Sequence, residues 1–315
     1  MSYVETISKV LPVILLFLLG FLIKQINFLK VETMQELKKL VINITLPLAL
    51  FLAFANAQIQ PVYLIISGIT FLLCIIILIL GRGLNRKIGG GSSYFPPLLT
   101  GFEAGMMGYA VYSSVYGAEN IFKFAIVDIG QVTFVFFILV SLLESLRSGK
   151  KPILETAAGF IKTPVIIAII LGILVNQSGM MPVVVQNPLA NSLIDTFKII
   201  SSMTTPLIAM IIGFEMKLQK GNLFQPFKTI LIRLALWIPL ALLVVYFVVN
   251  QWLGLDKGFA AAVLTMYILP PPFVIPLFID PANTKDRTYV NNTLSLSVLA
   301  SLIVFVIISV VLPPG

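Results

Sequence analysis

Ten residues in the first half of the chain, Gly101-Phe102-Glu103-Ala104-Gly105-Met106-Met107-Gly108-Tyr109-Ala110, place three glycines and one carboxylate in an otherwise apolar stretch. Glycine costs about 1 kcal/mol in a helix interior, and an acid at the centre of a bilayer costs at least about 2.5 kcal/mol. An irregular backbone that lines a cavity avoids both costs, because protein or water then satisfies its polar groups. The stretch therefore predicts a broken helix beside a cavity.

The composition of the whole chain indicates a membrane protein. Of 315 residues, 58% are hydrophobic and 11% are charged, and the mean hydropathy is +1.03, far from the usual values of soluble domains. Apolar runs of the ~20 residues that cross hydrocarbon as a helix recur along the chain, whereas the strands of a barrel would alternate over about ten. We predict an all-α integral membrane protein whose partner is the lipid bilayer.

Several function classes lack support in the sequence. The chain has one cysteine, Cys74, and no histidine, so we expect neither a disulfide framework nor a metal site. The net charge of +8 lies in short segments between apolar runs, which argues for membrane topology and against a nucleic-acid partner. No nucleophile elbow or phosphate-binding loop is present, so we do not expect an enzyme.

The apolar runs predict ten membrane-spanning helices. They cover residues 7 to 26, 36 to 55, 61 to 81, 94 to 116, 120 to 145, 160 to 178, 189 to 214, 227 to 250, 257 to 279 and 288 to 312.

Basic residues fall on alternate connections between these spans. Seventeen lysines and arginines are assigned to one side, among them Lys38, Arg82 and Arg233, and only Lys9, Lys123, Lys198 and Lys257 to the other. Cytoplasmic loops carry the excess of basic residues. Both termini are therefore predicted to be extracytoplasmic, and the chain to be a multi-pass protein of the inner (plasma) membrane of the cell.

An internal repeat divides the chain into residues 1–150 and 151–315. Pro12-Val13-Ile14-Leu15-Leu16-Phe17-Leu18-Leu19-Gly20 matches Pro164-Val165-Ile166-Ile167-Ala168-Ile169-Ile170-Leu171-Gly172, and Thr45-Leu46-Pro47-Leu48 matches Thr204-Thr205-Pro206-Leu207. Each half holds five predicted spans, and an odd number gives the halves opposite orientations. Inverted repeats are typical of transporters, whose site lies where discontinuous helices meet. We interpret residues 101 to 110 as the centre of such a site.

The ninth span contains the corresponding interruption, Leu269-Pro270-Pro271-Pro272-Phe273. Three consecutive prolines remove three N–H donors and exclude a continuous helix; a loop between two shorter spans is the alternative. We predict that spans four and nine are broken and cross, with half-helix N-termini that attract a small anion and no arginine inside the membrane. At these breaks we assign Glu103, Gly105, Gly108, Pro271 and Pro272 to substrate binding.

Polar residues on other spans are further candidates. Asp128 and Gln131 lie three apart on one face of the fifth span, and an intramembrane acid is a functional candidate by default. Asn43 precedes a proline kink, and Asn291 opens the tenth span. We assign Asn43, Gln131 and Asn291 to substrate binding, and Asp128 together with Glu103 to ion coupling. Backbone satisfaction at the kink is the alternative for Asn43, and structural pairing is the alternative for Asp128.

Three stretches of the chain resemble the auxin efflux carrier family, which includes plant PIN-FORMED proteins and bacterial malate and malonate permeases. They are Asn43-Ile44-Thr45-Leu46-Pro47-Leu48-Ala49-Leu50-Phe51, Pro206-Leu207-Ile208-Ala209-Met210-Ile211-Ile212-Gly213, and the run from Gln131 to Glu144. The resemblance extends over essentially the whole length. It implies two inverted five-helix repeats with broken, crossing helices 4 and 9, a scaffold from helices 1, 2, 6 and 7, and a mobile transport domain from helices 3–5 and 8–10. It also implies an elevator mechanism and a homodimer through the scaffold.

The fourth span departs from the family pattern of asparagine, any residue, glycine, two residues, glycine, any residue and proline. Glu103 stands where asparagine is usual, and Ala110 where proline is usual. An asparagine amide donates to a carboxylate, whereas an ionised glutamate only accepts and repels it. A protonated Glu103 can donate a hydrogen bond to a carboxylate, as asparagine does, so we expect Glu103 to couple transport to H⁺ or Na⁺. The alternative is a neutral acid that only holds the broken helix in place.

Together these features predict a secondary active transporter that moves a small organic carboxylate by elevator-type alternating access. No cofactor is expected apart from the coupling ion. Two alternatives stay open. The first is a cation/proton antiporter of similar fold, with Glu103 and Asp128 as the exchanging carboxylates; the second is a non-transporting membrane sensor.

Overall fold

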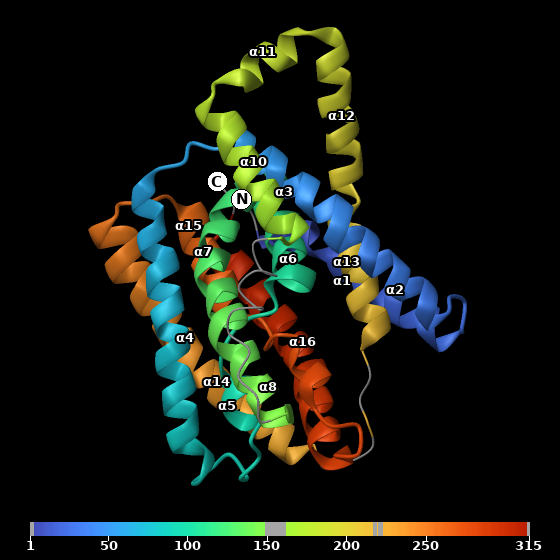
Figure 1. Ribbon diagram of the computed structural model, residues 1–315, viewed down its shortest axis with the longest axis vertical. Helices are drawn as coiled ribbons and strands as arrows, with labels where there is room; N and C mark the ends of the chain where they lie inside the picture. Colours follow the sequence, from blue (N-terminus) through green and yellow to red (C-terminus); the bar gives the residue numbers. More distant parts are fainter. Residues whose placement is uncertain (1–2, 149–161, 217–218, 220–222, 314–315) are drawn as a thin grey trace.

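The computed structural model describes residues 3–148, 162–216, 219 and 223–313, and every regular element within them is helical (Figure 1). Labels with η mark short π or 3₁₀ turns, most of which continue a neighbouring helix. The first half contains α1 (Tyr3–Gln25), α2 (Val31–Leu40), η1 (Val41–Thr45), α3 (Leu46–Asn56), η2 (Pro61–Tyr63), α4 (Leu64–Asn85), α5 (Phe95–Leu99), η3 (Ala104–Gly108), α6 (Tyr109–Tyr116), η4 (Ala118–Asn120), α7 (Ile121–Phe134), η5 (Val135–Leu139) and α8 (Val140–Ser148).

The second half also consists of long helices and interrupted helices. It contains α10 (Pro164–Gln177), α11 (Met180–Gln186), α12 (Pro188–Ser202), α13 (Thr204–Glu215), α14 (Phe224–Leu243), η6 (Val244–Trp252), α15 (Lys257–Ile268), η7 (Ile275–Phe278) and α16 (Thr284–Val311).

Six continuous helical segments in the described residues are long and apolar enough to cross a membrane. They are Val31–Asn56, Pro61–Asn85, Ala118–Arg147, Pro188–Glu215, Phe224–Trp252 and Thr284–Val311. Helices α10 and α11, which bend by 86° at their junction, make a seventh if they are counted as one span. The chain is therefore an all-helical multi-pass membrane protein in these residues, while the ten-span inverted repeat and its two domains remain predictions.

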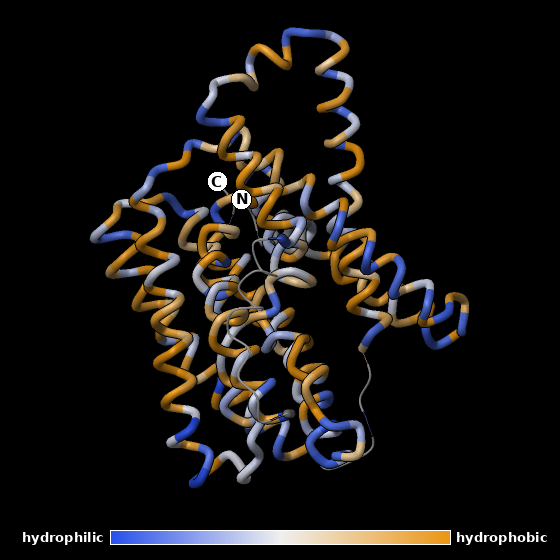
Figure 2. Tube along the Cα trace, viewed as in Figure 1, coloured by the Kyte–Doolittle hydropathy of each residue, from blue (hydrophilic) through white to orange (hydrophobic). Residues whose placement is uncertain are grey.

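The surface of the long helices suits lipid. Leu15, Leu72, Ile79, Leu174 and Phe247 each remain more than half exposed, which would be costly over so wide an area in water. Figure 2 shows that hydrophilic residues gather in the connections at the ends of the helices, whereas the helices themselves are mainly hydrophobic. This pattern is the one expected of a bilayer-embedded bundle.

Small residues allow the helices of the predicted repeats to approach closely. A side chain at Gly20 of α1 would collide with the backbone of Met210 in α13, and one at Gly213 would collide with the backbone of Phe17. A Cβ atom at Gly172 of α10 would lie 2.8 Å from the carbonyl oxygen of Phe51 in α3. Membrane helices associate through such contacts because lipid provides no hydrophobic driving force between them.

One element differs from the sequence prediction. The stretch between the predicted sixth and seventh spans was expected to be a connection, but it contains the helix α11. Gly179, in the left-handed region at φ 64°, turns the chain out of α10, and Asn187 then caps α12 by accepting the N–H groups of Leu189 and Ala190. The three helices form an arch at one end of the molecule (Figure 1).

Both predicted interruptions are confirmed as breaks in helical structure. Helix α5 ends at Leu99, and η3 begins only at Ala104. Helix α15 ends at Ile268, and the next turn, η7, begins at Ile275. The two non-helical segments contact each other, since the backbone N–H of Glu103 donates to the carbonyl oxygen of Pro270 at 2.9 Å. The candidate site is built on this contact.

Candidate functional site

The carboxylate of Glu103 joins the two broken segments. Its Oε1 accepts the backbone N–H of Met106 at 3.0 Å, which caps the first turn of η3, and its Oε2 accepts the backbone N–H of Phe273 at 2.6 Å. Both donors are backbone groups that a helix break leaves without a partner. The acid that the sequence marked as unusual therefore satisfies one N–H from each break.

Gly101 permits this geometry. Its φ of +66° lies in the left-handed region, where a side chain is strained. A Cβ atom there would also lie 2.8 Å from Cγ of Pro272. Glycine is thus required at this position both by the turn that ends α5 and by the proximity of the second break.

Arg233 on α14 corrects two of the sequence predictions. The side chain was assigned to a cytoplasmic connection, and no arginine was expected inside the membrane, but Arg233 is 2% exposed and lies within the membrane-spanning segment Phe224–Trp252. Its guanidinium donates to the carbonyl oxygens of Leu98 at 3.1 Å, Gly101 at 2.5 Å and Leu269 at 3.0 Å. The available signal was a single charge well inside an apolar run.

The charges at the breaks match the helix dipoles. Arg233 lies at the C-terminal ends of α5 and α15, where unpaired carbonyl groups concentrate negative partial charge, and Glu103 lies at the N-terminal end of η3. Trp237, one turn after Arg233, donates from Nε1 to the carbonyl oxygen of Leu99 at 2.8 Å. Helix α14 therefore supplies the donors that a continuous helix would have provided.

A second polar network ties α7 to the first break. The carboxylate of Asp128 accepts hydrogen bonds from Gln131 Nε2 at 2.6 Å and from the Tyr109 hydroxyl at 2.8 Å. Gln131 in turn accepts the backbone N–H of Phe102 through Oε1 at 3.1 Å. Asp128 and Gln131 are buried. The network positions Asp128 beside the same cavity as Glu103.

That cavity has a volume of about 490 Å³, a size typical of small-molecule sites. Most of its lining is apolar, and the polar side chains that reach it include Asn43, Glu103, Tyr109, Asp128 and Gln131. No lysine or arginine occurs among the described residues that line it. One wall comes from η1 and the beginning of α10, and the other comes from η3, α7, η5 and the proline segment.

The cavity brings together most of the site residues predicted from the sequence. The predicted residues that line it are Asn43, Glu103, Gly105, Asp128, Gln131 and Pro272. Gly108 does not line it, because a side chain there would collide with Phe124 and Leu269; it serves close packing in this structure. Pro271 is buried in the break outside the cavity lining. The roles of all these residues in binding and coupling remain predictions.

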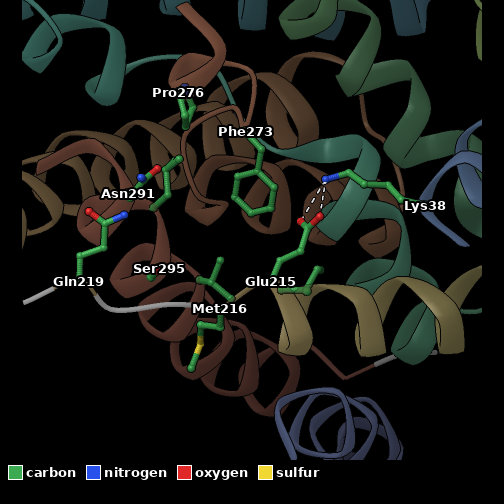
Figure 3. Close-up of a pocket in the computed structure, with 11 residues that line it drawn as sticks. Lys38, Glu215, Met216, Gln219, Phe273, Pro276, Asn291 and Ser295 are labelled. Carbon is green, nitrogen blue, oxygen red and sulfur yellow. Dashed lines mark hydrogen bonds and ion pairs between the residues drawn. The ribbon is translucent and has the colours of Figure 1, made fainter. Parts of the chain in front are cut away.

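Asn291 lines a different cavity, of about 330 Å³ (Figure 3). The ring of Phe273 stands between Asn291 and the ion pair that Lys38 makes with Glu215 at 2.9 Å. Pro272 and Val274 face the larger cavity, whereas Phe273 faces this one. The proline segment therefore separates the two cavities. Phe273, which the sequence analysis did not single out, donates its backbone N–H to Glu103 and places its ring in the smaller cavity.

No metal centre is evident at the site. Within the described part of the chain, no group of three or more histidine, cysteine, aspartate or glutamate side chains could hold a metal ion. The acids of the larger cavity are instead bound by N–H and O–H donors.

No protein-family model matches the chain. A protein of Methanothermobacter thermautotrophicus named "Uncharacterized transporter" is 26% identical over 188 residues, which make up 57% of this chain and 60% of that protein. The match thus spans less than two thirds of the relative's length. The chain is similar, at a distance, to a protein named as a transporter.

Proposed function

We propose that this protein is a secondary active transporter that moves a small organic carboxylate across the inner (plasma) membrane by elevator-type alternating access. The observation that carries the proposal is the cavity of about 490 Å³ beside two contacting helix breaks. Irregular backbone at membrane depth is tolerated where it lines such a cavity, and transporters place their sites at discontinuous helices. The name of the distant relative, "Uncharacterized transporter", agrees with transport.

The walls of the cavity support a mechanism in which two groups of helices move relative to each other. Residues of η1 and α10 belong to the helices proposed as a scaffold, whereas those of η3, α7 and the proline segment belong to the proposed transport domain. A solute held between the two groups could be exposed first to one side and then to the other. This arrangement requires the ten-span inverted repeat, which is part of the proposal.

The proposed binding groups include one carboxyl group, that of Glu103, and several neutral groups. Asn43 places an amide in the scaffold wall, while Gln131 and the backbone of Gly105 lie in the opposite wall. Apolar side chains make up most of the remaining lining. A carboxylate with a small apolar body would fit this combination, because most ligand sites join a largely apolar wall to a few polar groups.

A second candidate is cation/proton exchange. It is favoured by one observation, namely that Glu103 and Asp128 both line the cavity while no described lysine or arginine does. Such a lining attracts cations and repels anions when both acids are ionised.

Transport into proteoliposomes tests both candidates. Uptake of radiolabelled malate and malonate would be measured with and without imposed pH or sodium gradients, against protein-free vesicles. Accumulation of either anion under a gradient supports the proposal. Gradient-driven movement of ²²Na⁺ or ⁸⁶Rb⁺ without carboxylate uptake supports cation exchange, and binding of a carboxylate without any flux indicates a sensor.

A further inference from the structure

The Glu103 carboxylate occupies the position where a carboxylate of the substrate would be expected to bind. The N–H groups of Met106 and Phe273 point at its two oxygens from 3.0 Å and 2.6 Å. Met106 is in the first turn of the continuous helical segment formed by η3 and α6, whose positive end favours an anion. Glu103 is half-buried and borders the cavity directly. The N–H groups that could bind a substrate carboxylate therefore already bind a carboxylate of the protein itself.

Two cationic groups close to the helix breaks, Arg233 and Lys38, are already engaged elsewhere. The guanidinium of Arg233 donates hydrogen bonds to the carbonyl oxygens of Leu98, Gly101 and Leu269. Lys38 lies in the smaller cavity and is paired with Glu215 at 2.9 Å. An incoming anion would therefore find no free positive charge among the described lining residues, and the N–H groups held by Glu103 are the donors best suited to receive it.

The remaining titratable groups of the cavity are held in a separate network. Asp128 on α7 accepts hydrogen bonds from Tyr109 on α6 and from Gln131. These donors keep Asp128 in place without using the N–H groups at the break. Its charge adds to that of Glu103 in repelling an anion, so neutralising one of the two acids is the simplest way to admit a carboxylate.

A proton suits Glu103 better than a metal ion does. Each oxygen of the carboxylate faces an N–H donor, and a donor hydrogen repels a cation placed on the same side. A sodium ion also needs several oxygen ligands, whereas both oxygens of Glu103 already accept N–H donors. A proton requires a single lone pair, and it converts the carboxylate into a neutral group that donates a hydrogen bond.

We propose that the cavity accepts a carboxylate only after Glu103 has taken up a proton, so that one proton crosses the membrane with each solute molecule. This inference rests on the proposed function. The proton comes from water and forms an O–H bond on Glu103. The neutral acid releases the N–H groups of Met106 and Phe273 to the carboxylate of the solute. On the other side the solute leaves, the proton returns to water, and Glu103 takes back both donors.

Proton movement measured during carboxylate uptake tests this coupling. Vesicles that contain the purified protein and a trapped pH-sensitive dye would receive radiolabelled malate or malonate, and Glu103→Gln would be compared with wild type. Glu36→Gln is the matched control, because Glu36 is exposed on α2, lies outside the cavity lining and pairs with nearby Lys39. Wild type and Glu36→Gln should carry one proton per anion and slow about tenfold for each pH unit in the alkaline range, as the protonated fraction falls. Glu103→Gln should transport without protons and without this pH dependence.

The outcomes separate the inference from the proposed function. Carboxylate uptake by wild type with no accompanying proton overturns the inference and leaves the transporter proposal standing. The same conclusion follows if Glu103→Gln keeps wild-type proton movement. Absence of carboxylate uptake by every variant overturns the proposed function itself. The wild-type proton count remains decisive even if Glu103→Gln does not fold.

Discussion

Arg233 and Glu103 contact the same pair of helix breaks through opposite kinds of backbone group. Arg233 donates to carbonyl oxygens at the ends of α5 and α15, and Glu103 accepts N–H groups just beyond the breaks. Charges placed this way contribute about 0.3–1 kcal/mol each at exposed helix ends, and up to ~2 kcal/mol where they are partly buried. Replacing Arg233 with an apolar side chain leaves backbone carbonyl groups unpaired in a place that water does not readily reach, because Arg233 is 2% exposed.

Replacing Arg233 is predicted to destabilise the fold strongly. Arg233→Ala removes the partner of three carbonyl groups, and each buried unsatisfied group costs about 1–3 kcal/mol. Arg233→Lys should recover only part of this loss, because an ammonium group lacks the planar fork that reaches several carbonyls at once. Thermal unfolding can be followed with a thiol-reactive dye, since Cys74 is the one cysteine of the chain and is fully buried.

Arg86→Ala provides the matched control for that experiment, because Arg86 is exposed at the end of α4. It should unfold at the wild-type temperature. Equal unfolding temperatures for Arg233→Ala and Arg86→Ala would contradict the assigned role of Arg233.

At the scale of single elements, the start of α15 depends on Asp256. Its Oδ1 accepts the N–H groups of Gly258 at 2.8 Å and Phe259 at 3.2 Å, and its Oδ2 accepts Lys123 Nζ at 2.7 Å. Partial burial raises the pKa of the Asp256 carboxyl, but the hydrogen bond and charge of Lys123 outweigh it, so the pKa is below its usual value. Asp256 thereby links α15, the helix that precedes the proline segment, to Lys123 of α7.

The stability that Asp256 provides should depend on pH. A carboxyl whose pKa is lowered by folding stabilises the protein fully above its usual pKa, 3.8, and loses this effect as the pH falls further. Asp256→Ala is predicted to cost about 1 kcal/mol at neutral pH through loss of the N-terminal cap. The difference from wild type should shrink on acidification, as measured by unfolding monitored through tryptophan fluorescence. A difference that stays constant into strong acid would contradict the role of the charge.

At the scale of the whole molecule, the sequence predicted the helical membrane class and the two interruptions. Apolar runs of span length mark the long helices, and the run Pro270–Pro272 marks the second break because prolines exclude regular helix. Of the glycines near Glu103, Gly101 lies in the first break, whereas Gly105 and Gly108 lie in the helical turn η3. The larger cavity also contains six of the predicted site residues. The helical class and the breaks could be found because local composition determines them, and these site residues could be found because they are polar or helix-breaking residues within apolar runs.

Features that depend on packing between distant segments could not be found in the same way. Arg233 was misplaced because its three carbonyl partners come from α5, α15 and the first break, which only the tertiary structure brings together. The different cavity of Asn291 and the bend into α11 were missed for the same reason. Gly108 was assigned to binding because glycine composition does not distinguish close packing from an open cavity.

The central claim is that solute crosses the membrane through the cavity beside the breaks, and blocking that cavity tests it most directly. A side chain at Gly105 would point into the cavity, with Oε1 of Glu103 at 4.0 Å as its nearest contact. A Cβ atom at Gly68 on α4 would have no atom within 4 Å, but Gly68 does not line the cavity. Exchange of radiolabelled malate or malonate across vesicle membranes would be measured for Gly105→Phe and Gly68→Phe. The account predicts loss of exchange for Gly105→Phe and near wild-type exchange for Gly68→Phe; wild-type exchange by Gly105→Phe would contradict it.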